Sequence, residues 1–179
     1  MERPARYHPI LVGIHWLSAF LVIAMLIMGL FILRRMPNIE AKIPYLAIHM
    51  ATGIIILLLT ILRLVVRFST KLPAPARAGR ASLDLVGNIT HILLYLGMIA
   101  MGLSGLGIAS QAGLMDIVLG RSGDSLPINL YIYPSRFGHA YVGMALLLLI
   151  SLHVAAAFYH QFLRKDNLFA RMSFRKGGS

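Results

Sequence analysis

Histidine is the residue type whose placement in this chain points most directly to chemistry. Of the seven histidines, all except His8 lie within or at the end of a long apolar stretch. These are His15, His49, His91, His139, His153 and His160. A single such histidine could simply hydrogen-bond a neighbouring helix, but each one that is buried in apolar surroundings needs a partner. So many in one small protein indicate a shared function.

The apolar stretches that carry these histidines are long enough to cross a membrane. They lie near residues 12–33, 45–66, 86–108 and 138–160, and each approaches the roughly 20 residues of a helix that spans about 30 Å of hydrocarbon. They lack the alternation of membrane β-strands. The chain is 58% hydrophobic and only 13% charged. We therefore expect an all-α integral membrane protein, a four-helix bundle in a single domain over residues 1–179.

The spacing of four histidines predicts two facing pairs. His139 and His153 are separated by 14 positions, which is about 40° short of four full turns, so both project from nearly the same helix face about 21 Å apart. Successive helices run in opposite directions. His49 then lies at the depth of His139, and His15 lies at the depth of His153. We expect an outer pair, His49 with His139, and an inner pair, His15 with His153.

A haem iron needs two opposed ligands, and two imidazoles that face each other at one depth can supply them. The apolar porphyrin also suits burial between helices. A zinc site would need a third or fourth ligand nearby, and the outer pair has none. Two axial histidines leave no open position for oxygen, so such an iron carries electrons. The absence of cysteine excludes thiolate ligands and cysteine-attached haem. We therefore expect two haem b cofactors.

Three neighbouring residues fit the same interpretation. Gly53 and Gly143 each follow a proposed ligand by four positions, where a missing side chain would make room for a porphyrin edge; ordinary helix packing is the alternative. Arg136, shortly before His139, is placed to meet a haem propionate, with an ordinary interfacial cation as the alternative.

The remaining two histidines lie toward the inner side. His160 follows His153 by seven positions, which returns it to within about 20° of the same face. A histidine beside a haem edge can hydrogen-bond a quinone carbonyl and handle its proton. We therefore assign His160 and His91 to quinone binding. The alternative for His91 is that it replaces one of the inner haem ligands.

The formal net charge of +11 is explained by orientation rather than by a nucleic acid partner. Four spans place both termini and the second loop on one side, which carries most of the 17 lysines and arginines. These are Arg3, Arg6, Arg63, Arg67, Lys71, Arg77, Arg80, Arg164, Lys165, Arg171, Arg175 and Lys176. The positive-inside rule then predicts cytoplasmic termini. If the source is a Gram-negative bacterium, this is the orientation of a multi-pass inner-membrane protein whose first and third loops face the periplasm.

The opposite, periplasmic side is modestly cationic. It carries Arg34, Arg35, Lys42, Arg121 and Arg136 against Glu40, Asp116 and Asp124. A small anion would be drawn to this face, and Arg35 and Arg136 are the candidate residues. The third connection, about 109–134, mixes apolar and charged residues and predicts a short amphipathic helix on the outer surface.

Several short motifs resemble the prokaryotic cytochrome b561 family in its order and over nearly the whole chain. They are Ile14-His15-Trp16-Leu17, Ile48-His49 with Gly53, Arg63-Leu64, Gly138-His139, Leu152-His153-Val154-Ala155-Ala156-Ala157, and Lys165-Asp166-Asn167-Leu168 with Arg171-Met172. The resemblance implies a four-helix bundle with two b haems ligated at His15, His49, His139 and His153. Family members exchange electrons with the quinone pool, and a bacterial branch similar to this chain oxidises superoxide outside while reducing ubiquinone.

We therefore expect a lipid-embedded oxidoreductase that oxidises periplasmic superoxide to oxygen and reduces ubiquinone. A second hypothesis keeps the haems but makes the chain an electron-transfer subunit that links the quinone pool to a periplasmic redox partner; copurification with that partner would favour it. A third, from another class, is a histidine-lined metal or proton transporter. That protein would be colourless, whereas paired b haems give a red one.

Overall fold

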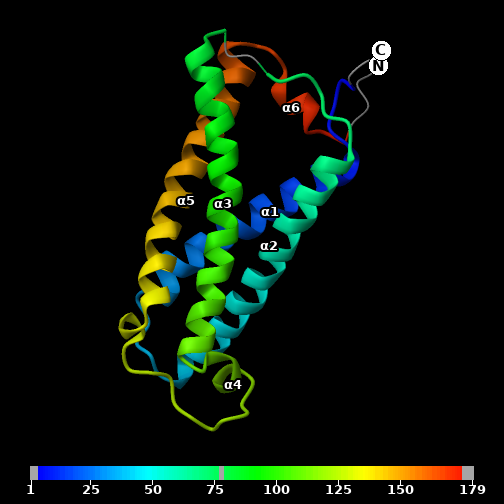
Figure 1. Ribbon diagram of the computed structural model, residues 1–179. Helices are drawn as coiled ribbons and strands as arrows, with labels where there is room; N and C mark the ends of the chain where they lie inside the picture. Colours follow the sequence, from blue (N-terminus) through cyan, green and yellow to red (C-terminus); the bar gives the residue numbers. More distant parts are fainter. Residues whose placement is uncertain (1–3, 77–78, 175–179) are drawn as a thin grey trace.

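The computed structural model describes residues 4–76 and 79–174 (Figure 1). Within these ranges the regular structure is entirely helical, and four helices are long and apolar enough to cross a membrane. The prediction of an all-α membrane bundle is confirmed. Some of the cations expected on the inner side lie outside the described residues, namely Arg3, Arg77, Arg175 and Lys176.

Each spanning helix begins a few residues before its apolar stretch. Their bounds are α1, Pro9–Ile27, with a π-helical continuation Met28–Leu33; α2, Ile43–Ser69, after a 3-10 turn Glu40–Lys42; α3, Ala81–Gln111; and α5, Pro134–Phe158, with a π-helical continuation Tyr159–Leu163. Two short helices, α4 (Leu114–Val118) and α6 (Leu168–Arg171), and a 3-10 turn (Leu130–Ile132) lie in the connections. Prolines stand in the first turns of α1, α2 and α5, where a missing N–H costs nothing.

α1 packs on α2, α2 on α3, and α3 on α5, and the last of these contacts is the most extensive. Figure 1 shows α1 crossing behind α3. Glycines of α3 make the close approaches. A Cβ at Gly97 would come within 2.8 Å of the Leu146 side chain of α5, and one at Gly102 within 3.0 Å of Leu57 of α2. Small residues at these positions bring the helix backbones together, as is usual in membrane bundles.

One end of the bundle, here called the α4 end, is closed by an apolar cluster. Buried residues of α2, α3, α4 and the following loop form it: Leu46, Ile108, Ala109, Ala112, Leu114, Ile117 and Leu126. The Asn38 side chain joins two loops there, because its Nδ2 donates to the carbonyls of Pro127 (2.8 Å) and Ile128 (3.2 Å). These contacts hold the starts of α2 and α5 in fixed positions.

The opposite end, here called the terminal end, is bridged by α6 (Figure 1). The backbone N–H of Tyr7 donates to the carbonyl of Arg171, and the Trp16 indole donates to the carbonyl of Met172 at 2.8 Å. The Arg171 guanidinium in turn donates to the carbonyl of Ala74 in the loop between α2 and α3. The chain following α5 is therefore tied to both the start of α1 and the end of α2.

Replacing Gly97 by leucine should disrupt the contact between α3 and α5. Leu146 is only 1% exposed and cannot move aside freely, so we expect the free energy of unfolding to fall by about 1–3 kcal/mol, the usual cost of overpacking. Denaturant unfolding in detergent would measure this. Gly138→Leu is the matched control, because a Cβ at Gly138 meets nothing within 4 Å. Equal losses in the two variants would contradict the packing argument.

Candidate functional site

The first histidine pair lies toward the α4 end. His49 is in the second turn of α2 and His139 is in the second turn of α5. Their ring centroids are 6.1 Å apart, and the ring planes are inclined at 69°. These two residues, separated by 90 positions in the sequence, therefore face each other across the bundle.

The second group of histidines lies toward the terminal end. The rings of His15, on α1, and His153, on α5, have centroids 6.2 Å apart with planes inclined at 77°. His91, on α3, also approaches His153, with a centroid distance of 5.2 Å. The structure thus brings together both pairs that the spacing predicts and adds His91 to the second.

The separation of the rings tests whether a haem iron fits between them. Two metal–imidazole bonds of about 2 Å, plus roughly 1 Å from each nitrogen to its ring centre, require centroids about 6 Å apart. The pairs His49–His139 and His15–His153 match this distance. His91 lies about 1 Å too close to His153 to face it across an iron. The residues present therefore fit two bis-histidine haems.

In the pair at the α4 end, the surroundings of each Nδ1 atom indicate whether the other ring nitrogen, Nε2, could bind a metal. The Ser104 hydroxyl of α3 lies 2.9 Å from the carbonyl of Met101 and 3.1 Å from Nδ1 of His139, so it can donate to the carbonyl and accept from a protonated Nδ1. In that tautomer Nε2 of His139 is unprotonated and available to a metal, as in other histidine ligands oriented by a second partner. Nδ1 of His49 is buried and has no hydrogen-bond partner among the described residues.

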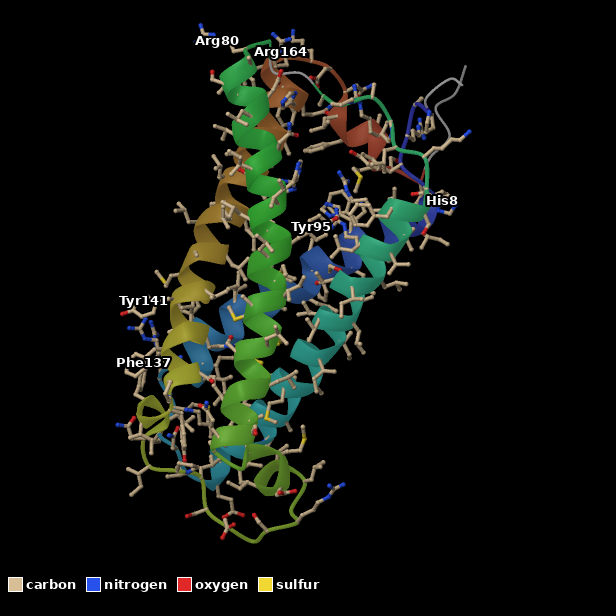
Figure 2. The ribbon with its side chains drawn as sticks, in the orientation of Figure 1. His8, Arg80, Tyr95, Phe137, Tyr141 and Arg164 are labelled. Carbon is tan, nitrogen blue, oxygen red and sulfur yellow. The ribbon has the colours of Figure 1, made fainter. Side chains whose placement is uncertain are left out.

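His15 is engaged differently. Its Nδ1 lies 2.7 Å from Nη1 of Arg63, and since arginine only donates, this nitrogen accepts. The Arg63 guanidinium carbon lies 5.7 Å from the ring centroid of Tyr95, which projects from α3 toward α2 (Figure 2). Sequence analysis places Arg63 among the inner cations but does not predict its contact with His15. Its position 14 residues after His49, the same spacing as that from His139 to His153, is the signal that could have indicated it. His15, His91 and His153 are called the histidine cluster below.

The two glycines assigned to porphyrin packing differ in their surroundings. A Cβ at Gly53 would meet nothing within 4 Å, so there is room beside this position. A Cβ at Gly143 would lie 3.2 Å from the terminal methyl of Met101, so Gly143 faces α3. Two glycines not singled out by sequence lie beside the rings: Gly29, opposite His49, and Gly105, opposite His139.

His160 lies at the terminal end of α5, paired with an acid. Its Nδ1 is 2.7 Å from Oδ2 of Asp166, and the side chains are 13% and 26% exposed. Asp166 is flanked by Lys165 and Asn167, whose backbones have positive φ angles of 55° and 56°. This tight turn brings the carboxylate back onto the helix. Sequence analysis does not anticipate the pairing. Asparagine often adopts left-handed backbone, but lysine does not, so the sequence gives no signal for the conformation of Lys165.

The cations at the α4 end are not equivalent. Arg34, Arg35 and Arg121 are exposed. Arg136 packs on Tyr131, with its guanidinium carbon 4.6 Å from the ring centroid. Lys42, counted with the outer cations by sequence, is only 6% exposed and donates to the Met36 carbonyl and Asn38 Oδ1. Its charge stabilises a loop and is not part of the surface.

Comparison with known proteins gives the family. The profile described as prokaryotic cytochrome b561 matches residues 6–175. The chain is 28% identical to "Cytochrome b561 homolog 2" of Escherichia coli (strain K12), over 94% of this chain and 92% of that protein. It is also 28% identical to "Probable superoxide oxidase CybB" of Yersinia pestis, over 97% of this chain and 98% of that one.

The family match covers all four spanning helices and both histidine pairs. Cytochromes b carry haem b and transfer electrons, which agrees with the fit of an iron between the paired rings. The chain is an electron-transferring membrane oxidoreductase and belongs to the prokaryotic cytochrome b561 family.

Proposed function

We propose that this protein holds two b haems and moves electrons from periplasmic superoxide, at the α4 end, to ubiquinone, at the terminal end. The observation that carries the proposal is the presence of two histidine pairs with ring separations of 6.1 and 6.2 Å, one toward each end of the bundle. His49 and His139 would hold one haem, and His15 and His153 the other. Bound haem supplies a one-electron carrier at each depth.

The distribution of charge supports the orientation. The described cations at the terminal end include Arg80 and Arg164, which lie together there (Figure 2), as well as Arg6, Lys71, Lys165 and Arg171. By the positive-inside rule this end faces the cytoplasm. The α4 end then faces the periplasm of a bacterial inner membrane.

At the cytoplasmic end, His160 and Asp166 are suited to handle protons. The carboxylate holds Nδ1 of His160 and leaves Nε2 to meet a quinone carbonyl. Two superoxide ions give up one electron each and become oxygen, and one quinone takes both electrons and two protons to become quinol. His160 would deliver one of these protons, with Asp166 stabilising the imidazolium. His91 is a second candidate for contact with the quinone. Its ring lies 5.2 Å from that of His153, too close for the two to share an iron, so His91 is not needed as a haem ligand.

At the periplasmic end, the exposed Arg34, Arg35 and Arg121 support attraction of a small anion. The relative named as a probable superoxide oxidase supports superoxide as that anion. Docking of a periplasmic redox protein on the same face is the alternative. A histidine-lined metal transporter is less well supported. His15 and His91 both approach His153, but among the described residues no three histidine or acidic side chains are arranged to hold one metal ion.

Alanine substitution of the paired histidines tests the haem assignment. His49→Ala or His139→Ala should remove one haem and His15→Ala or His153→Ala the other, because each iron loses an axial ligand. Haem content per chain should fall by about half in each variant, measured by reduced-minus-oxidised spectra with haem and protein quantified. His91→Ala should retain both haems. Loss of a haem in His91→Ala but not in His15→Ala would show that the inner pair is wrong.

Substitution of His160 by phenylalanine tests the quinone end. Both haems should stay bound, while reduction of a soluble ubiquinone analogue should slow by roughly a hundredfold, the smaller end of what a positioned proton donor contributes. Stopped-flow spectroscopy of haem oxidation would measure this rate. His8→Phe is the matched control, since His8 is exposed at the same end, before α1. Unchanged quinone kinetics in His160→Phe would remove the proposed role.

Salt and charge reversal test the periplasmic donor. Haem reduction by superoxide should be fast and should slow as salt is raised from 0.1 to 1 M, because the Debye length falls from about 10 to about 3 Å. Arg35→Glu and Arg136→Glu should slow the same step, whereas Arg164→Glu, at the other end, should not.

Arg136 also contacts Tyr131, so the haem spectrum of its variant must first be shown to be intact. Superoxide reduction that is insensitive to both salt and charge reversal, or absent altogether, would favour the periplasmic protein partner.

A further inference from the structure

Arg63 carries a charge that the described part of the chain leaves without an opposite charge. Its side chain extends from α2 into the histidine cluster, it forms no ion pair with any described carboxylate, and its Nε is buried without a hydrogen-bond partner. Arginine does not lose its proton in proteins. Neither the hydrogen bond to His15 nor the contact with Tyr95 supplies the counter-charge that a buried cation needs. The position therefore calls for an anion.

The depth of Arg63 within the bundle indicates where that anion comes from. It lies 14 residues beyond His49 along α2, about 21 Å, which places it level with the His15–His153 pair. The helix continues for six more residues to Ser69, about 9 Å, before it reaches the loop. A lipid phosphate at the surface would lie nearer the end of α2. An anion brought into the bundle beside the ring pair fits the depth better.

The hydrogen bond to His15 cannot be the permanent partner of Arg63 if His15 binds iron. A neutral histidine that binds a metal through Nε2 carries its proton on Nδ1, and that nitrogen can then only donate. Arg63 also only donates. Two donors 2.7 Å apart do not form a hydrogen bond, so the contact seen here must open when His15 takes up its ligand. Ser104 and His139 show no such conflict, because the Ser104 hydroxyl can accept a hydrogen bond from a protonated Nδ1.

We propose that Arg63 is the binding site for a carboxylate of the haem held at the terminal-end pair, and that its guanidinium leaves His15 for this carboxylate as the haem enters. The unpartnered Nε and an adjacent Nη supply the parallel donors of a bidentate fork, which matches a carboxylate. A porphyrin propionate provides the counter-charge and enters at the required depth. The inference rests on the proposed two-haem function.

The test compares haem with its dimethyl ester, in which both propionates are uncharged. Full-length apoprotein carrying His139→Ala, which leaves only the terminal-end site, is titrated with each ligand in detergent, with and without Arg63→Gln. Soret absorbance reports binding. The single tryptophan, Trp16, reports it through fluorescence quenching, since its ring centroid lies 5.2 Å from that of His15.

Arg63→Gln should weaken haem binding by about tenfold or more, because a hydrogen-bonded charge pair is lost. The same change should leave binding of the diester nearly unaltered. Arg63→Lys should recover part of the affinity for haem only, as expected for a point charge without the fork. Arg34→Gln, an arginine at the opposite end, should alter neither ligand.

Equal weakening of haem and diester by Arg63→Gln would overturn the proposal, because Arg63 would then act through His15 or through packing. No weakening with either ligand would also overturn it and would leave a lipid phosphate or a free anion as the partner. Should Arg63→Gln not fold, the Arg63→Lys protein carries the same two-ligand comparison. An unsubstituted chain that binds fewer than two haems would count against the proposed function instead.

Discussion

The cost of an unpartnered polar group in hydrocarbon governs this structure. Helices satisfy their own backbone, which is why the described chain crosses the membrane only as helices. The same cost applies to side chains. Ser104 places its hydroxyl between a backbone carbonyl and a histidine, and Arg63 places its guanidinium on another histidine. A buried polar atom that has no partner among the described residues, such as Nδ1 of His49, is an exception to this rule.

The four helices contribute different numbers of histidines to the two ring pairs. α5 supplies a histidine to each pair, and α1 and α2 supply one each. α3 supplies no paired ligand, yet it contributes Ser104 beside one pair and His91 and Tyr95 beside the other. α5 carries two of the paired histidines, and its most extensive contact is with α3. α3 therefore holds α5 in place and also supplies side chains beside both pairs. The closeness permitted by Gly97 therefore matters at both depths.

The pairing of histidines could be predicted from sequence because it depends only on helix geometry. A 14-residue interval and alternating helix directions are sufficient to place His139 and His153 opposite His49 and His15. The partners of these rings could not be predicted, because the lateral order and rotation of helices depend on packing. Nothing in the sequence puts Ser104 beside His139, turns Gly143 toward Met101, or buries Lys42 in its loop. Local turns such as the one that returns Asp166 to His160 are equally hidden.

The two ends of the bundle are closed by different forces, and this difference suits their proposed tasks. Aliphatic packing closes the α4 end, where Asn38 also ties two loops together. At the terminal end, the segment after α5 is held by hydrogen bonds through Tyr7, Trp16 and Arg171 and by the aromatic contacts of Phe169 with Phe158 and Phe162. Aromatic side chains offer a flat apolar surface, which suits the ring of the proposed acceptor, a quinone. The hydrogen-bonded pair of His160 and Asp166 lies at the same end, so groups for ring contact and for proton transfer occur together there.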